Sequence, residues 1–302
     1  MFSVFVIFAL LIGTNFANIS VLQPRIKHYN PAKPSLDSVN FDQYHHYNEL
    51  SDILKLINQT YPQLCYLYSI GNSVQGRELW VMKLSTTPRE LFTIGKPSVK
   101  IVGNIHGNEG VGREMILRFM LFMLNNYETS EDVRNILDHT DIHLLPSMNP
   151  DGFEKSSEGD CDGIDGRYNA NGFDLNRNFP DFFEKYRKIK TQPETAAIKR
   201  WLNTIPFSLS ASLHGGALVA SYAFDNRPRT RYFQYNEGPS ISPDDDVFRH
   251  LSLTYSRSHQ EMYKEVACPR DQNGFKNGIT NGAEWYPLAG GMQDYNYIYH
   301  GC

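Results

Sequence analysis

The chain has 302 residues, of which 41% are hydrophobic and 21% are charged, and its formal net charge is −4 at pH 7. This composition is typical of a soluble globular protein with one large domain or two ordinary ones. It gives no reason to expect nucleic acid or an anionic membrane as a partner, because both favour a basic chain.

The N-terminus has the pattern of a secretory signal peptide. A continuous apolar run at 4–12 is followed by small and polar residues that end near Ala17, although the usual positive charge at the start is missing. The run is shorter than the roughly 20 residues that a membrane span needs, and no other stretch is long enough. We therefore expect a signal peptide at 1–17, a secreted protein, and an extended, proline-containing leader at 18–40.

The cysteines agree with an oxidising compartment. There are four, at Cys65, Cys161, Cys268 and Cys302. They lack the Cys-x-x-Cys spacing of a structural zinc site, so disulfide bonds are the better interpretation. Four cysteines allow three pairings, and the sequence does not choose among them. Sequons at Asn18 and Asn58 indicate a glycoprotein if the chain is secreted.

Hydrophobic periodicity predicts alternating helices and strands from residue 41 onward. The predicted strands lie at 65–70, 78–84, 101–105, 141–145 and 208–213, and the predicted helices begin at 41 (ending before Pro62), 111, 130, 194 and 244. The passage at 147–192 and the tail from 268 are predicted to be loops, because both are rich in Gly and Asn. The alternation favours an α/β fold with a mixed sheet.

The stretch at 101–110 carries the first candidate metal ligands. Its apolar strand breaks at Gly107, so His106 lies at the carboxyl end of a strand and Glu109 at the start of a helix. Open α/β sheets build their ligand sites at such positions. A histidine and a glutamate could supply two of the three protein ligands of a catalytic zinc ion. The same spacing also occurs by chance, as a loop histidine beside a helix-start glutamate. A second strand ends similarly, in His214-Gly215.

Five motifs occur together from residue 106 onward. They are HGNEGVGRE at 106–114, SMNPDGFE at 147–154, GRYNANGFDLNRNFPD at 166–181, SLHGG at 212–216 and GITNGAEWYPLAGGMQDYNY at 278–297. With them, the chain from 41 to 302 resembles a zinc metallocarboxypeptidase of the regulatory subfamily, the group of carboxypeptidases N, E, M and D. The resemblance implies one catalytic domain at 41–302, with a mixed, twisted β-sheet flanked by helices on both faces. It also implies one zinc ion per chain, peptide or protein substrates and a monomeric state.

The resemblance assigns the catalytic roles residue by residue. His106, Glu109 and His214 match the zinc ligands of the family. Arg167 matches the arginine that stabilises the developing oxyanion, which is a task for a positive group aimed at the transition state. Tyr286 matches the mobile tyrosine that closes over the substrate.

The substrate-binding residues follow in the same way. Asn176 and Arg177 match the pair that binds the C-terminal carboxylate of the substrate, which a planar guanidinium can bind bidentately. Asp225 matches the acidic residue by which this subfamily prefers a C-terminal Arg or Lys, and Gln293 matches its polar partner. Without the family, Asp225 would be read as an ordinary turn residue.

The sequence also departs from the family pattern. The general base of the family is a glutamate on a strand beyond the position of Cys302, so we expect this glutamate, the final strand and helix, and the usual transthyretin-like domain to be missing from the 302 residues. The function expected from the resemblance is that of a secreted zinc exopeptidase that removes C-terminal Arg or Lys, with an incomplete sequence. The alternatives are a catalytically inactive peptide-binding protein or truncated isoform, and a related zinc hydrolase of different specificity.

Overall fold

The structure is a computed structural model, and it describes residues 36, 39–160, 163–228, 238–266 and 274–302. The expected signal peptide, nearly all of the leader, Cys161 and Cys268 lie outside these residues. Cys65 and Cys302 are free thiols, so the expectation of disulfide bonds does not hold for these two. Across the described ranges, no helix combines the length and the apolar character that crossing a bilayer requires.

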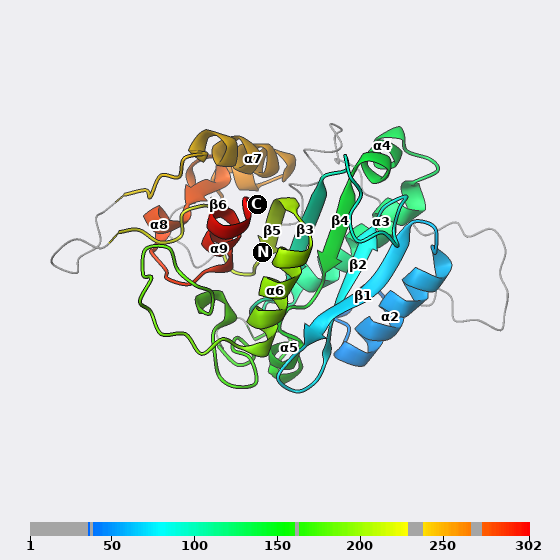
Figure 1. Ribbon diagram of the computed structural model, residues 1–302, viewed down its shortest axis with the longest axis horizontal. Coiled ribbons are helices and arrows are strands. Elements are labelled where there is room, and N and C mark those ends of the chain that lie inside the picture. The colour runs from blue at the N-terminus through cyan, green and yellow to red at the C-terminus, as the bar shows by residue number, and fades with distance from the viewer. Residues whose placement is uncertain (1–35, 37–38, 161–162, 229–237, 267–273) are drawn as a thin grey trace.

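A five-stranded mixed sheet organises the molecule (Figure 1). Its strands are β1 (Cys65–Asn72), β2 (Glu78–Leu84), β3 (Ser98–Gly103), β4 (Asp141–Leu145) and β5 (Phe207–Leu213). They lie in the order β1-β2-β4-β3-β5, in which β2 is antiparallel to β1 and β4, and β3 is parallel to β4 and β5. Every residue of β3 and β4 is buried, as expected for interior strands covered on both faces.

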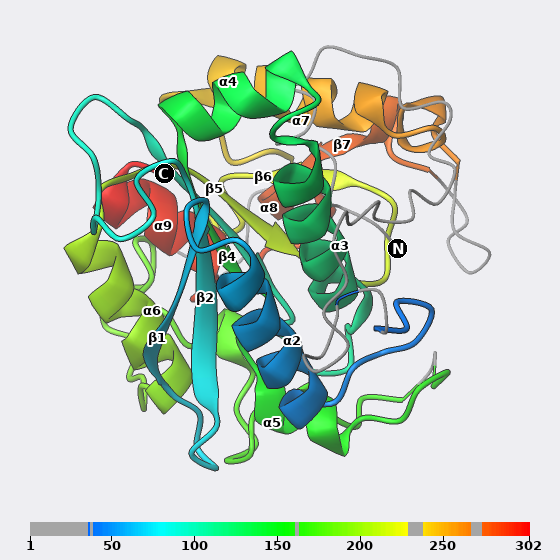
Figure 2. The same ribbon diagram turned by 90° about the vertical axis from the view of Figure 1, so that its right-hand side faces the viewer.

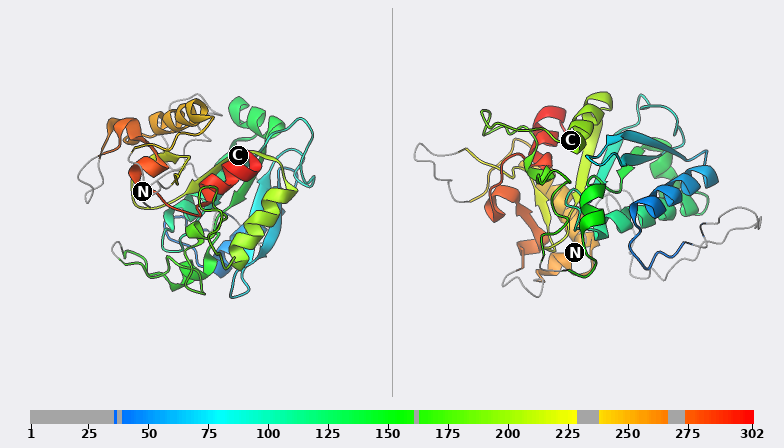
Figure 3. Two further views of the ribbon diagram at one scale, coloured as in Figure 1. Left: turned by 60° about the vertical axis from the view of Figure 1, so that its left-hand side comes forward. Right: turned by 90° about the horizontal axis from the view of Figure 1, so that it is seen from below.

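Helices cover both faces of this sheet. Helices α2 (Tyr47–Thr60), α3 (Val111–Asn126) and α4 (Glu131–His139) lie on one face (Figure 2), and α6 (Pro193–Thr204) and α9 (Met292–His300) lie on the other (Figure 3). The sheet separates two hydrophobic cores, one beneath α2, α3 and α4 and the other beneath α6 and α9. Successive side chains of a strand point to opposite faces, so Ile101 packs in the first of these cores and its neighbour Val102 in the second. The expected mixed sheet flanked by helices on both faces is confirmed.

A second, smaller unit lies beyond the end of β5. Strands β6 (Ala220–Tyr222) and β7 (Ile279–Asn281) form a short parallel pair, which contacts α7 (Asp245–Ser258). The short helix α8 (Gly282–Trp285) continues directly from β7. The ends of β3 and β5 lead to His106 and His214, and the end of β6 in the second unit leads to Asp225.

Four predicted elements differ from the structure. The strand predicted at 101–105 is β3 at Ser98–Gly103, which ends two residues earlier and starts three residues earlier. The first helix begins at Tyr47 rather than at 41, where the Glu49 carboxylate accepts the backbone N–H of His46. The passage at 147–192 contains the helix α5 (Pro150–Lys155), capped by the Asn149 side chain, so its reading as loop throughout was wrong. The tail was also wrongly predicted as loop, because α9 lies in it.

Candidate metal centre and substrate pocket

The site is built where two neighbouring parallel strands end. Gly103 of β3 pairs with Leu213 of β5, so the segments that follow these strands emerge at the same edge of the sheet. The connection from β3 to β4 runs through α3 and α4 on one face, and that from β4 to β5 runs through α6 on the other. This is the switch point at which open α/β sheets bind ligands. His106 follows β3, and His214 follows β5.

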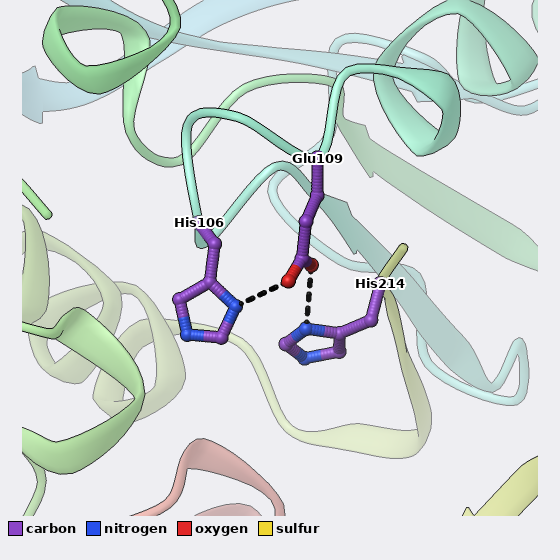
Figure 4. Close-up of side chains that lie close together, drawn as sticks. All are labelled: His106, Glu109 and His214. Atoms are coloured by element: carbon purple, nitrogen blue, oxygen red, sulfur yellow. Dashed lines mark hydrogen bonds and ion pairs between the residues drawn. The ribbon is translucent and has the colours of Figure 1, made fainter. Parts of the chain in front are cut away.

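The Glu109 carboxylate lies between the two histidines (Figure 4). Its Oε1 is 2.8 Å from Nδ1 of His106, and its Oε2 is 2.8 Å from Nδ1 of His214. The backbone N–H of Gly215 also donates to Oε2, at 3.0 Å. Helix α3 can come this close to β5 because Gly112 has no side chain. A Cβ at that position would lie 2.7 Å from the Cβ of Leu213.

These three residues fit a zinc ion. One ligand atom from each of His106, Glu109 and His214 lies within 4.8 Å of the others (Figure 4). Two imidazoles and one carboxylate form a ligand set used by catalytic zinc sites, which keep a further position open for water or substrate. The three residues predicted as ligands are therefore brought together by the fold.

Asp174 is a residue of the site that the sequence analysis did not single out. Its Oδ1 is 3.1 Å from Nε2 of His106, and its Oδ2 accepts a hydrogen bond from Nη2 of Arg167 at 2.8 Å. When Nε2–H donates to this carboxylate, the lone pair of Nδ1 faces Glu109 and His214, which is the tautomer that a metal requires. Asp174 lies inside one of the five motifs, but nothing in its spacing indicates that it faces His106.

The charged forms of the residues in this network stabilise one another. Burial works against ionisation of Glu109, yet the His214 and His106 imidazoles hold the pKa of its carboxyl well below the usual range. Burial is likewise outweighed at Asp174, where His106 and Arg167 keep the pKa of the carboxyl low. For His106, burial is outweighed by Asp174 and Glu109, which raise the pKa of the imidazole. Nη1 of Arg167 lies 3.6 Å from Oε1 of Glu109, so two carboxylates share this arginine.

The predicted pocket residues also meet. Asp225 follows β6 and is only 8% exposed, and Nε2 of Gln293 donates to its Oδ1 at 3.0 Å. Two glycines leave room for the carboxylate. A Cβ on Gly282 would lie 2.0 Å from Oδ1 of Asp225, and one on Gly291 would lie 3.1 Å from Oδ2. The buried Asp225 carboxylate is therefore held by an amide donor in a space that two glycines leave open.

Three buried aspartates cluster around this pocket. Burial raises the pKa of the Asp225 carboxyl to about 7, a change that the Arg177 guanidinium opposes and the Asp181 carboxylate reinforces. Burial and the charge of Asp225 also raise the pKa of Asp294. Asp294 accepts the backbone N–H groups of Asp225 at 2.8 Å and Asn226 at 3.0 Å, and so ties the pocket to α9. Neither Asp181 nor Asp294 was singled out from the sequence.

Asn176 and Arg177 connect the metal centre to this pocket. The backbone N–H of Asn176 donates to Oδ1 of Asp174 at 2.9 Å, and its side-chain oxygen accepts the backbone N–H of Met292 at 3.0 Å. The Arg177 guanidinium lowers the pKa of both Asp174 and Asp225, so its charge acts on the metal centre and on the pocket.

Tyr286 occupies a different position from the other predicted residues. It follows α8 and is 45% exposed, and its ring packs against that of Trp285 with centroids 4.9 Å apart. In the part of the chain that the structure describes, no hydrogen bond, ion pair or ring contact joins it to the network around Glu109. The fold therefore brings together every predicted site residue except Tyr286, which lies at the surface.

Comparison with known proteins agrees with this geometry. A model of the zinc carboxypeptidase family matches residues 50–302. The chain is 47% identical over 269 residues to carboxypeptidase M of Mus musculus, covering 89% of the chain and 59% of that protein. It is 44% identical over 295 residues to carboxypeptidase D of Anas platyrhynchos, covering 94% of the chain and 20% of that protein. The chain thus spans less than two thirds of the length of these relatives. The crystal structure of carboxypeptidase A from Helicoverpa armigera shares the fold, with a TM-score of 0.65 and 20% identity over 86% of the chain and 63% of that structure.

Proposed function

The chain belongs to the zinc carboxypeptidase family, and from this we propose that it is a secreted, zinc-dependent exopeptidase that removes C-terminal Arg or Lys from peptides or proteins. Its similarity to carboxypeptidases M and D is consistent with the regulatory subfamily. The observation that carries the proposal is the buried Asp225 carboxylate, which accepts a hydrogen bond from Gln293 and feels the charge of Arg177, in a chain whose His106, Glu109 and His214 converge. The proposed catalytic domain extends over 41–302.

One zinc ion per chain would be held by His106, Glu109 and His214, whose ligand atoms converge within 4.8 Å. Such an ion would polarise the scissile carbonyl and lower the pKa of a bound water toward about 7. The role of Asp174 is to orient His106, because it accepts the proton on the far side of the ring.

The substrate's terminal carboxylate would be bound by Arg177 and Asn176. A guanidinium recognises a carboxylate bidentately, so a peptide with a free C-terminus is preferred over one that is blocked. Arg167 would stabilise the oxyanion, since its guanidinium is held beside the cluster by Asp174 and Glu109. Tyr286, which is 45% exposed, would close over the bound peptide.

The pocket would select the side chain that is removed. A buried carboxylate is costly unless a positive group pairs with it, and the pKa of about 7 at Asp225 reflects that cost in the absence of substrate. The guanidinium of Arg or the ammonium of Lys would supply the missing charge, whereas a C-terminal Glu or Phe would not. Gln293 would hold Oδ1 so that Oδ2 faces the substrate.

The proposal is tested with matched peptides that differ only in a C-terminal Arg, Lys, Phe or Glu. Purified chain loaded with zinc is incubated with each peptide, and the released amino acid is quantified. C-terminally amidated peptides and a zinc chelator are the controls, and both should abolish release. Faster removal of Phe or Glu than of Arg or Lys would refute the pocket assignment. Tight binding of the Arg peptide without any release would instead support the alternative of an inactive peptide-binding protein.

Secretion is supported by the apolar run at 4–12 alone. We expect a chain expressed in eukaryotic cells to appear in the medium with a new N-terminus near residue 18. Deletion of 1–17 should retain it inside the cell. Equal amounts of both forms in the medium would contradict the signal-peptide assignment.

A further inference from the structure

A buried asparagine lies at the base of the loop that carries two of the three candidate metal ligands. Asn104 directly follows β3 and is fully buried. Its φ is 60°, in the left-handed region that few residues other than glycine adopt. Asparagine tolerates this conformation better than most residues, yet glycine would do so at no cost. Something besides the backbone conformation therefore has to account for a side chain here.

The Asn104 amide is surrounded by carbonyl groups of the ligand loop. Its Nδ2 donates to the backbone oxygens of His106 at 2.9 Å, Gly107 at 2.8 Å and Glu109 at 3.3 Å. Two of these three carbonyls belong to the candidate ligands themselves. The loop thus curls around a single –NH₂ group, whose two hydrogens are shared among three acceptors.

The other side of the amide is anchored to a neighbouring strand. The Ser147 hydroxyl, just beyond β4, donates to Oδ1 of Asn104 at 2.8 Å, which orients Nδ2 toward the loop. The backbone oxygen of Asn104 accepts the N–H of Asn149, the residue that caps α5, at 2.9 Å. The loop is therefore held by an amide whose own orientation is set by the end of β4.

We propose that Asn104 is a positioning residue for the metal centre: its amide gathers the carbonyls of the ligand loop and so sets the distance between His106 and Glu109. The inference rests on the proposed zinc site. Three carbonyl oxygens that point toward one point repel each other, and the amide offsets this repulsion only in the curled conformation. Without it the loop would open, and the two ligands would have to be reordered each time a metal binds. Partners of metal ligands typically contribute 10–100-fold to metal affinity.

The test compares the zinc dissociation constant of the parent chain with that of Asn104→Gly, measured by competition with a chelating dye. Glycine tolerates the positive φ and removes the side chain together with its amide. The matched control is Asn281→Ala, because Asn281 is also fully buried and its Nδ2 also donates to two carbonyls, those of Ala223 and Ser240, each at 3.1 Å. Thermal unfolding of the metal-free proteins is recorded alongside, so that a general loss of stability is separated from a loss of zinc affinity.

We expect Asn104→Gly to bind zinc about 10-fold or more weakly, and Asn281→Ala to lose stability while its zinc affinity is unchanged. Ser147→Ala should show a smaller loss of zinc affinity, and it decides the matter if Asn104→Gly does not fold. The inference is overturned if Asn104→Gly, or Ser147→Ala in its place, binds zinc as tightly as the parent. It is also overturned if Asn281→Ala loses as much zinc affinity as Asn104→Gly. Failure of the parent chain to bind zinc would overturn the proposed function as well.

Discussion

Replacing Asp225 with Asn should make the substrate-free protein more stable and its substrate preference weaker. Asparagine has nearly the shape of aspartate, so it should fill the space beside Gly282 and Gly291 without moving the backbone. The change removes the charge that burial disfavours and that a basic substrate requires. Stability and specificity should therefore change in opposite directions.

The expected change in folding stability follows from the pKa of Asp225. Burial raises the pKa of Asp225 from 3.8 to about 7, a change of about 3 units. At 1.36 kcal/mol per unit, an ionised Asp225 costs the folded, substrate-free chain about 4 kcal/mol. Because the folded pKa is the higher one, the folded state holds its proton more tightly than the unfolded state. This stabilising contribution is complete below about pH 4 and is lost as the pH rises to 7. Asp225→Asn should abolish that loss.

The expected loss of specificity follows from the removal of the Asp225 charge. A hydrogen bond to a charged group contributes about 1.5–3 kcal/mol, so kcat/KM for a peptide ending in Arg should fall about 10- to 150-fold. A matched peptide ending in Ala makes no such bond and should be hydrolysed at nearly the parent rate.

Two measurements decide the matter. Thermal unfolding at pH 5 and pH 8 should show that Asp225→Asn gains most over the parent at pH 8. Paired kinetics with the Arg and Ala peptides should show the loss for Arg alone, with zinc content measured as a control. If the variant keeps its preference for Arg, or if it loses zinc instead, the pocket assignment is wrong. If it is less stable than the parent at pH 8, the cost of burying the charge has been overestimated.

Four further outcomes are expected. KM for a C-terminal Arg peptide should rise as the pH falls below about 7, because Asp225 takes up a proton. KM for an Ala peptide should stay constant from pH 5 to 8, and parallel pH profiles for the two peptides would contradict this. Arg167→Ala should lower kcat by about 10²–10³-fold with little change in KM, since oxyanion stabilisation acts only in the transition state; an equal rise in KM would point to substrate binding. His214→Ala should release zinc to a competing chelator at far lower chelator concentration than the parent, and unchanged retention would exclude it as a ligand. Asp141→Asn should destabilise the chain by about 3–5 kcal/mol in urea unfolding, because it removes the negative charge 2.9 Å from the buried Lys83 ammonium and leaves that ammonium with backbone carbonyls alone; a loss below about 1 kcal/mol would refute this role.

Much of the architecture could be predicted because it is encoded locally. The strands at 78–84 and 141–145 were predicted at their observed bounds, since their residues alternate or run apolar over a short, turn-bounded stretch. Helix α9 was missed because its stability comes from contacts that no periodicity reveals. Its Asp294 accepts backbone N–H groups from a loop 68 and 69 positions away along the chain.

The sequence by itself determined the residue types of the candidate site, because the five motifs place His106, Glu109, Arg177, His214 and Gln293 in a recognisable order. Only the tertiary structure decided how these residues meet and which others support them. The pairing of β3 with β5 brings Glu109 to a histidine 105 positions away, and the segment after β6 brings the Asp225 carboxylate to Gln293 of α9, 68 positions away. Asp174 and Asn104 act through hydrogen bonds to several residues, and this packing sets those bonds. A motif records which side chains are present, whereas strand register and backbone geometry set the distances between them.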